Sequence, residues 1–198
     1  MNRLFIENKY TRMVNTETCN IKRGDHVKIP KQIQKLKELN MSTKDKQATM
    51  NVSEVFHLWN HLVQRYNIIY LTNILNLFAK DEDLKIILAF GKKVLESHIM
   101  LLEKEMMAYG IPLPVRHPKQ AQTTASLEQI SDRFIFRRVL RGIQAFLPTH
   151  TMAFMHSTSP KIRELFMSFL AEEMKLYDKL MEYGKVKGYT IMPPIYRP

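Results

Sequence analysis

Four long stretches between residues 51 and 183 carry apolar residues at helical spacing. In the first stretch the apolar face is predicted to include Val55, Leu58, Trp59, Leu62, Tyr66 and Ile69. The faces of the other three include, in chain order, Ile87, Val94, His98, Leu101 and Leu102; Phe134, Val139 and Phe146; and Phe166, Phe169, Glu173, Tyr177 and Leu180. These patterns predict an all-α bundle of four helices.

Capping residues set the ends of the first two predicted helices. Asn51 and Glu54, three residues apart, have the pattern of a capping box, and the helix that follows should run to about Ala79. The second helix follows the acidic break at residues 80–83 and stops at Gly110, a residue suited to the position after a helix end.

The third helix is predicted to begin at Ser126, with Gln129 three residues on as part of the cap, and to run to about Ser157. Pro148 lies within it, so a bend is expected there. The third helix therefore starts only after a long link.

The connections between helices predict their order in space. The turn before the fourth helix is short, because Ser159 and Pro160 start that helix, which ends at Gly184. The link at residues 110–125 contains three prolines and should be extended. It reaches about 50 Å, and the second helix is roughly 40 Å long. The chain can therefore return along the bundle, in the up-down-down-up, ferritin-like order with a long crossover between helices two and three.

Composition supports one such domain with an appended arm. The chain has 198 residues, 45% of them hydrophobic and only 6 of them glycine, which suits one sizeable helical core. Residues 1–50 are predicted to form a basic, largely irregular arm with one short helix at residues 31–39. Residues 51–198 form the bundle and a proline-rich C-terminal tail.

Charge is the one unusual bulk property of the chain. The formal net charge is +11, and the first 50 residues, with 11 Lys/Arg and 5 Asp/Glu, contribute +6 of it. Such a segment favours an acidic protein or another anionic surface as partner, or is simply solvated. No motif that reads bases accompanies the charge, so specific nucleic-acid binding is not favoured.

A second basic feature lies on the predicted third helix. Arg133, Arg137 and Arg141 recur at four-residue spacing and, with Arg138 beside them, form a ridge. The ridge is either a solvated face, which is usual for such a run, or a site for phosphate or an acidic partner.

Cysteine usage and hydropathy bear on the compartment. The single cysteine, Cys19, cannot form an internal disulfide or a cysteine-based zinc site, which fits a reducing cytoplasm. The N-terminus lacks the apolar run of a signal peptide, and the most apolar stretch, residues 68–79, is interrupted by polar side chains. We therefore expect a cytoplasmic protein without a membrane span.

A di-iron carboxylate centre in such a bundle needs two Glu-x-x-His motifs, because bridging carboxylates and inward imidazoles hold the two metals. The chain offers one, Glu54 to His57, in the first turn of the first helix, where Glu54 also serves as a cap. A centre of that type is therefore not favoured.

A looser metal site remains open. Counted along their own helices, His61, His98, His150 and Glu172 lie within about 7.5 Å of one level of the bundle. Imidazole and carboxylate groups suit iron, zinc or manganese. Glu173 is the alternative to Glu172, and His57 could join from one turn below. The competing interpretation is a set of hydrogen-bonded core residues, in which His61 faces the flank of its helix.

Several short motifs also resemble an uncharacterised family of ferritin-like proteins common in spore-forming bacteria and loosely related to spore coat protein F. The matching elements are Leu58-Trp59, His98-Ile99, Gly110 to Pro114, Ser131-Asp132, and the ending from Lys187-Gly188-Tyr189 through Pro193-Pro194 to Pro198. Ser159 stands where the family usually has an Arg. The resemblance covers residues 51–198 and implies spore association without an established activity.

Three functions follow from these expectations. The first is a non-enzymatic structural or interaction protein, as the resemblance implies. The second is a metal-binding bundle, oxidase-like, that uses His61, His98, His150 and Glu172. Anion binding through the basic arm and the arginine ridge is a third. Apolar bundle faces often associate, so a homodimer is compatible with all three.

Overall fold

The computed structural model describes residues 40–118, 130–191 and 193–194, which form five helices and no strand. The helices are α2 (Thr43–Thr49), α3 (Val52–Phe78), α4 (Glu82–Ala108), α5 (Asp132–His156) and α6 (Pro160–Val186). The prediction of an all-helical protein is confirmed. The helix at residues 31–39 that the sequence predicts lies outside the described residues.

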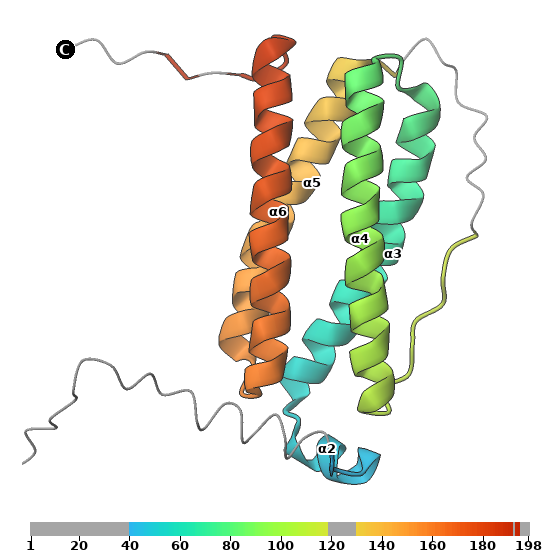
Figure 1. Ribbon diagram of the computed structural model, residues 1–198, viewed down its shortest axis with the longest axis vertical. Helices are drawn as coiled ribbons and strands as arrows, with labels where there is room; N and C mark the ends of the chain where they lie inside the picture. Colours follow the sequence, from blue (N-terminus) through green and yellow to red (C-terminus); the bar gives the residue numbers. More distant parts are fainter. Residues whose placement is uncertain (1–39, 119–129, 192, 195–198) are drawn as a thin grey trace, which may run out of the picture.

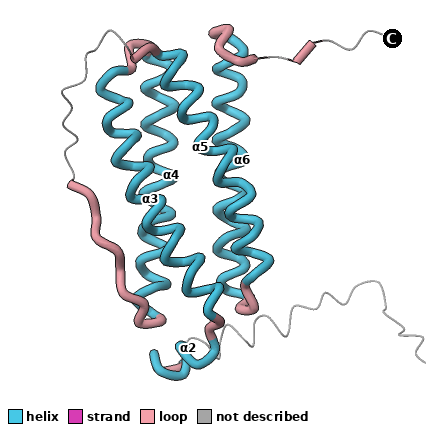
Figure 2. Tube along the Cα trace, turned by 180° about the vertical axis from the view of Figure 1, so that it is seen from behind, coloured by secondary structure: helices cyan, strands magenta, loops and turns pink. Residues whose placement is uncertain are grey.

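The four long helices pack as two hairpins laid against each other (Figures 1 and 2). Helix α3 packs closely along α4, and α5 along α6, whereas contacts of α3 with α5 and of α4 with α6 are sparser. Each hairpin has a short turn, after which its second helix begins at a capping residue. The cap is Asp81 for α4 and Ser159 for α6. The interior between the hairpins is therefore lined by all four helices.

Glu54 fastens one end of the bundle. One of its carboxylate oxygens accepts a hydrogen bond from the backbone N–H of Asn51 at 2.9 Å, which completes the predicted capping box. The other accepts from the backbone N–H groups of Thr158 and Ser159 at 2.8 and 2.7 Å. Since Glu54 is fully buried, it links the start of α3 to the turn between α5 and α6.

The opposite end is fastened by Asp132. Its carboxylate accepts hydrogen bonds from the backbone N–H groups of Lys80 and Asp81 at 2.8 and 3.1 Å, in the turn between α3 and α4. Helix α5 therefore begins at Asp132 with Ser131 as its cap, later than the sequence pattern predicts. The predicted cap residue Ser126 lies outside the described residues.

The stop of α4 at Gly110 is as predicted. Gly110 has a φ of +65°, and the N–H of Ile111 bonds the carbonyl of Met106 at 2.8 Å, as in a Schellman motif. Gly184, by contrast, does not end α6, which continues to Val186. At Gly184 a Cβ atom would lie 2.2 Å from the ring of Phe136, so this glycine gives the ring room to pack.

The buried apolar residues form two clusters. The first cluster lies around the start of α3 and consists of Leu58, Leu62, Tyr66, Ile99, Leu102, Met106, Tyr109, Ala153, Ile162, Phe166 and Phe169. The second cluster lies around the end of α3 and consists of Leu75, Phe78, Ala79, Leu84, Leu88, Ile135, Phe136, Ile143, Leu176, Leu180 and Tyr183. No helix among the described residues is long and apolar enough to cross a membrane.

Three residues predicted on buried faces are exposed instead. Trp59, Leu101 and Phe134 have 43%, 39% and 51% of their surface accessible. Each lies beside a residue that faces the core, such as Leu58 beside Trp59, and neighbours on a helix point about 100° apart. Helix α5 is continuous through Pro148, the residue at which the sequence predicts a bend.

Two further segments lie against the long helices. The first part of the link after α4, residues 111–118, is without regular secondary structure, as predicted, and His117 holds it to α3 by a hydrogen bond to Asn67 at 2.5 Å. Helix α2, which the sequence did not predict, docks through Gln47, whose side chain donates to the carbonyl of Tyr109 at 3.0 Å.

Candidate polar site in the bundle interior

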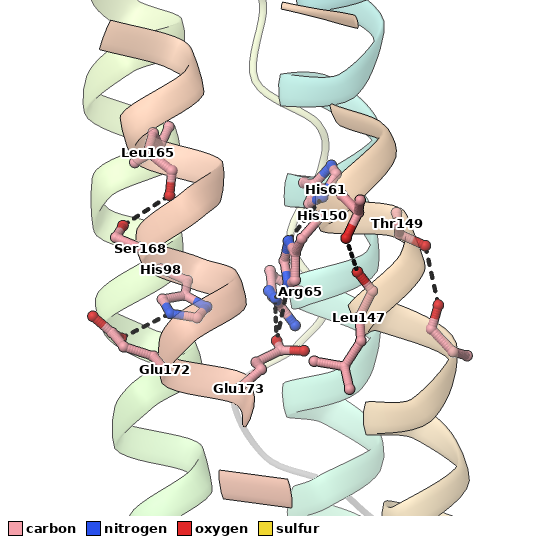
Figure 3. Close-up of polar contacts among 12 residues, drawn as sticks. His61, Arg65, His98, Leu147, Thr149, His150, Leu165, Ser168, Glu172 and Glu173 are labelled. Atoms are coloured by element: carbon pink, nitrogen blue, oxygen red, sulfur yellow. Dashed lines mark hydrogen bonds and ion pairs between the residues drawn. The ribbon is translucent and has the colours of Figure 1, made fainter. Parts of the chain in front are cut away.

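The structure places the four predicted metal ligands in the middle of the bundle, one on each long helix. His61, His98 and His150 are fully buried, so His61 faces the core and not the flank of its helix. Glu172 differs, since 45% of its side chain remains exposed. In Figure 3 His61 and His150 lie next to each other, and Glu172 lies next to His98 on the facing helices.

These side chains form two separate pairs. Nε2 of His61 lies 3.2 Å from Nδ1 of His150, and Nε2 of His98 lies 2.9 Å from a carboxylate oxygen of Glu172. The ring centroids of His98 and His150 are 6.5 Å apart. Across the described parts of the chain, no three His, Cys, Asp or Glu residues form a group that could hold a metal ion.

The residue at the centre of the site is Arg65, which the sequence did not single out. Its side chain is 1% exposed and forms an ion pair with buried Glu173, while its Nη2 lies 2.8 Å from Nε2 of His150 (Figure 3). The guanidinium also lies over the ring of Phe146, 4.3 Å from its centroid. Residue 65 lies seven positions after Leu58, so helical spacing places it on the same inward face. This spacing is the signal in the sequence from which its burial could be predicted.

Helix geometry also explains why Glu172 and Glu173 have different surroundings. The two adjacent residues point about 100° apart on α6, and only Glu173 is buried, where it contacts Arg65 and His150. The buried carboxylate of the site is thus the alternative considered in the sequence, and Glu172 lies at the edge of the interior beside His98.

One arrangement of protons satisfies the chain of contacts with neutral rings. The carbonyl of His57 can only accept, so Nδ1 of His61, at 2.7 Å, carries a proton and its Nε2 accepts. Nδ1 of His150 then donates to His61, and Nε2 of His150 accepts from Arg65. Both lone pairs that a metal ion would need are therefore engaged in hydrogen bonds.

Burial keeps these histidines neutral. It lowers the pKa of His61 to about 3, with His150 and Arg65 adding to the effect. Burial also lowers the pKa of His150, although neighbouring Glu173 opposes the change. For Glu173 burial is the largest single influence and acts to raise the pKa, but Arg65 and His150 together outweigh it and the pKa falls. A charged Arg65–Glu173 pair therefore lies beside neutral imidazoles.

His98 has a different environment. Its ring stacks on Phe169 with centroids 4.0 Å apart, and its Nε2–H donates to Glu172. Burial, followed by the charge of Arg65, lowers the pKa of His98 to about 2. Its other nitrogen, Nδ1, is buried and has no hydrogen-bond partner, so it is the one open imidazole lone pair among the predicted ligands.

His57 does not join the central site. Its Nε2 lies 3.0 Å from Nδ1 of His156 at the end of the bundle. Glu54, the other half of the single Glu-x-x-His motif, is occupied by backbone N–H groups. The arginine ridge is also separate, because Arg133, Arg137, Arg138 and Arg141 are all exposed on α5.

As arranged, the donor set does not fit a metal ion of the kind that ferritin-like bundles hold. The lone pairs of His61 and His150 receive hydrogen bonds, and the Arg65 guanidinium, itself a cation, lies against His150 and Glu173. A metal cation bound here would lie beside the positively charged guanidinium of Arg65, and two positive charges so close together repel strongly in a buried site. Arg65 occupies the role that a metal would have in balancing Glu173.

Comparison with known proteins places the chain. A model of the family described as protein of unknown function (DUF3231) matches residues 39–198 and so includes α2. None of the curated proteins matches the chain. The resemblance to an uncharacterised family related to spore coat protein is confirmed.

Two solved structures share the fold. A protein from Bacillus halodurans C-125, provisionally named a spore coat protein, has a TM-score of 0.69 and 22% identity and covers 75% of this chain and 96% of its own. The bacterioferritin-related protein from Bacteroides fragilis, a dodecameric thioferritin, has a TM-score of 0.58 and 12% identity and covers 74% and 93%. These similarities support a helical bundle, and the matched residues show that the chain belongs to the DUF3231 family of proteins of unknown function.

Proposed function

We propose that this protein is a non-enzymatic structural or interaction protein associated with spores. The proposal includes a ferritin-like, up-down-down-up bundle with the long crossover between α4 and α5. It also includes residues 1–50 as a basic arm that contacts an acidic protein or anionic surface, a second copy of the chain as a further partner, and a cytoplasmic location. The family and the spore coat-like neighbour support the association with spores.

The observation that carries the proposal is the position of Arg65. An interior built for redox or hydrolytic chemistry needs open metal ligands or an activated nucleophile. Here the central Glu173 is neutralised by an arginine side chain, and His61 and His150 are engaged in one chain of hydrogen bonds. Such a network favours a single well-defined packing of the four helices, as expected of a scaffold.

Metal content tests the proposal directly. Protein purified without an affinity tag should contain far less than one transition-metal ion per chain, and its melting temperature should not change on addition of iron, zinc or manganese. The spore association is tested by immunodetection in coat extracts of purified spores and in vegetative lysates. Stoichiometric metal would contradict the proposal of a non-enzymatic scaffold. Detection in vegetative cells alone would contradict the association with spores.

Metal binding is the second candidate, and the open Nδ1 of His98 favours it. Binding of iron, zinc or manganese by His61, His98, His150 and Glu172 would require Arg65 to leave the centre. The variant Arg65→Met should then take up metal more readily than the wild type, and the further change His98→Phe should abolish the gain. If neither Arg65→Met nor the wild type binds metal, this candidate is wrong.

A further inference from the structure

A cavity of about 310 Å³ lies between the two hairpins, adjoining the Arg65–Glu173 ion pair. Its lining on α3 extends from Gln64 to Leu75, which is about 16 Å along the helix. The walls are mostly aliphatic, with contributions from every long helix that include Leu75, Leu88, Leu95, Ile143, Leu176 and Leu180. The cavity is thus elongated along the bundle and apolar inside.

Two glycines line this space. A Cβ atom added to Gly91 of α4 would be 3.4 Å from the side chain of Leu176, and one added to Gly142 of α5 would meet no atom within 4 Å. Gly142 is exposed, whereas Leu176 is buried. The cavity therefore reaches from the surface of α5 to the core.

Positive charge is concentrated where the cavity meets the surface. Arg138 and Arg141 line it from α5 and are exposed, and Lys92 lines it from α4. Arg138 and Arg141 are three residues apart, so their side chains are neighbours on the helix. Among the described residues no carboxylate pairs with either arginine, and the acidic residue of the lining, Glu173, is already paired with Arg65. The lining therefore has an excess of three positive charges, one of which, Lys92, is paired at 3.9 Å with Glu96 outside the lining.

We propose that this cavity binds a single-chain amphiphile with an anionic head, namely an alkyl carboxylate of about ten carbons. Water occupies about 30 Å³ per molecule and a methylene group is of similar size, so the cavity has room for roughly ten such groups. The chain lies among the leucines, where burial of apolar surface favours it. The carboxylate accepts charge-assisted hydrogen bonds from Arg138 and Arg141 at the mouth.

Titration calorimetry with decanoate, below the concentration at which it forms micelles, tests the head group. The full chain should bind one decanoate saturably. The double variant Arg138→Gln/Arg141→Gln should bind it about tenfold more weakly, the loss expected for hydrogen bonds to a charged group. The matched control Arg133→Gln/Arg137→Gln makes the same charge change on the same helix away from the cavity and should bind as the wild type.

The neutral analogue 1-decanol separates the head from the chain. It should bind the wild type and Arg138→Gln/Arg141→Gln equally, because it has no charge for the arginines to recognise. Equal weakening of decanoate binding by the two arginine pairs would mean only diffuse attraction to the ridge and would overturn the assignment of the head site.

Occupation of the cavity itself is tested at Gly142. Gly142→Phe places a ring at the mouth and should abolish decanoate and decanol binding, whereas Gly142→Ala leaves the mouth open and should bind both as the wild type does. Circular dichroism checks that both variants fold, as expected for an exposed position without close neighbours. Absence of saturable binding to the wild type, or unchanged binding to Gly142→Phe, refutes the proposal.

Discussion

From the start to the middle of α3 the bundle is filled by rings and by hydrogen-bonded polar groups, whereas from the middle to the end of α3 mostly aliphatic side chains line a cavity. In the first region His61 contacts His150 and lies 4.6 Å, centroid to centroid, from the ring of Phe166. In the second, Leu88 and Leu176 face a space of about 310 Å³.

The difference shows how each region achieves a defined structure. Hydrogen bonds among Arg65, His150 and His61 require particular distances and directions, so the first region tolerates little change. Apolar contacts have no such direction, and a missing neighbour costs only the lost contact. We therefore expect a polar substitution in the first region to affect stability far more than a small change beside the cavity.

The largest expected effect is that of Glu173→Gln, which leaves the buried Arg65 without a charged partner. Loss of one member of a buried ion pair typically lowers the free energy of unfolding by about 3–5 kcal/mol. Urea unfolding measures the change. The matched control is Glu172→Gln, the half-exposed neighbour, which should lose at most about 1 kcal/mol.

The double variant Arg65→Met/Glu173→Leu sharpens this prediction. It replaces both charges with apolar groups of similar size, so it should regain most of the stability that Glu173→Gln loses. Equal losses for Glu172→Gln and Glu173→Gln would show that the ion pair does not distinguish the first region from the second.

Acidification should destabilise the protein through the same region. The folded-state pKa values of His61, His98 and His150 lie below 6.5, so below pH 6.5 the unfolded chain binds more protons than the folded one. The free energy of unfolding should therefore fall as pH decreases, by about 1.4 kcal/mol per pH unit each for His61 and His98, or roughly 3 kcal/mol for the two, with a further contribution of the same sign from His150.

Urea unfolding at intervals between pH 7 and 5 gives this slope. Substitution of His98 by Phe, which retains a ring against Phe169, should reduce the slope by about one proton. The lowered pKa of Glu173 acts in the same direction at lower pH, because protonation of its carboxyl removes the ion pair. A slope close to zero between pH 6.5 and 5 would contradict the buried neutral state of the histidines.

The smallest effects are expected in the second region, at two glycines. Gly142→Ala should raise the free energy of unfolding by about 0.5–1 kcal/mol, because alanine favours helix and its Cβ meets no atom within 4 Å. Gly184→Ala should lower it by about 1–3 kcal/mol, since its Cβ would clash with the ring of Phe136. Thermal unfolding of the pair distinguishes open from filled space, and the same sign for both would contradict this description.

The sequence predicts much of the site, but it does not predict which side chains pair with each other. Helical spacing brings His61, His98 and His150 to one level, and the structure places all three in the core. Arg65 is harder to predict from the sequence because a charged residue is seldom expected on a buried stripe, although its spacing from Leu58 marks it as inward-facing. Which carboxylate it meets depends on the rotation of α6, which spacing alone does not provide.

The sequence by itself determined the all-helical character of the protein and most helix ends, because periodicity and capping are local. Asn51 with Glu54, Ser159 with Pro160, and Gly110 each act within a few residues of their own position. The tertiary structure alone decided that Glu54 and Asp132 tie the ends of the two hairpins together, that Arg65 neutralises Glu173, and that a cavity remains beside them. These features depend on distances between helices that are remote in sequence, and such distances are set by packing of the whole bundle.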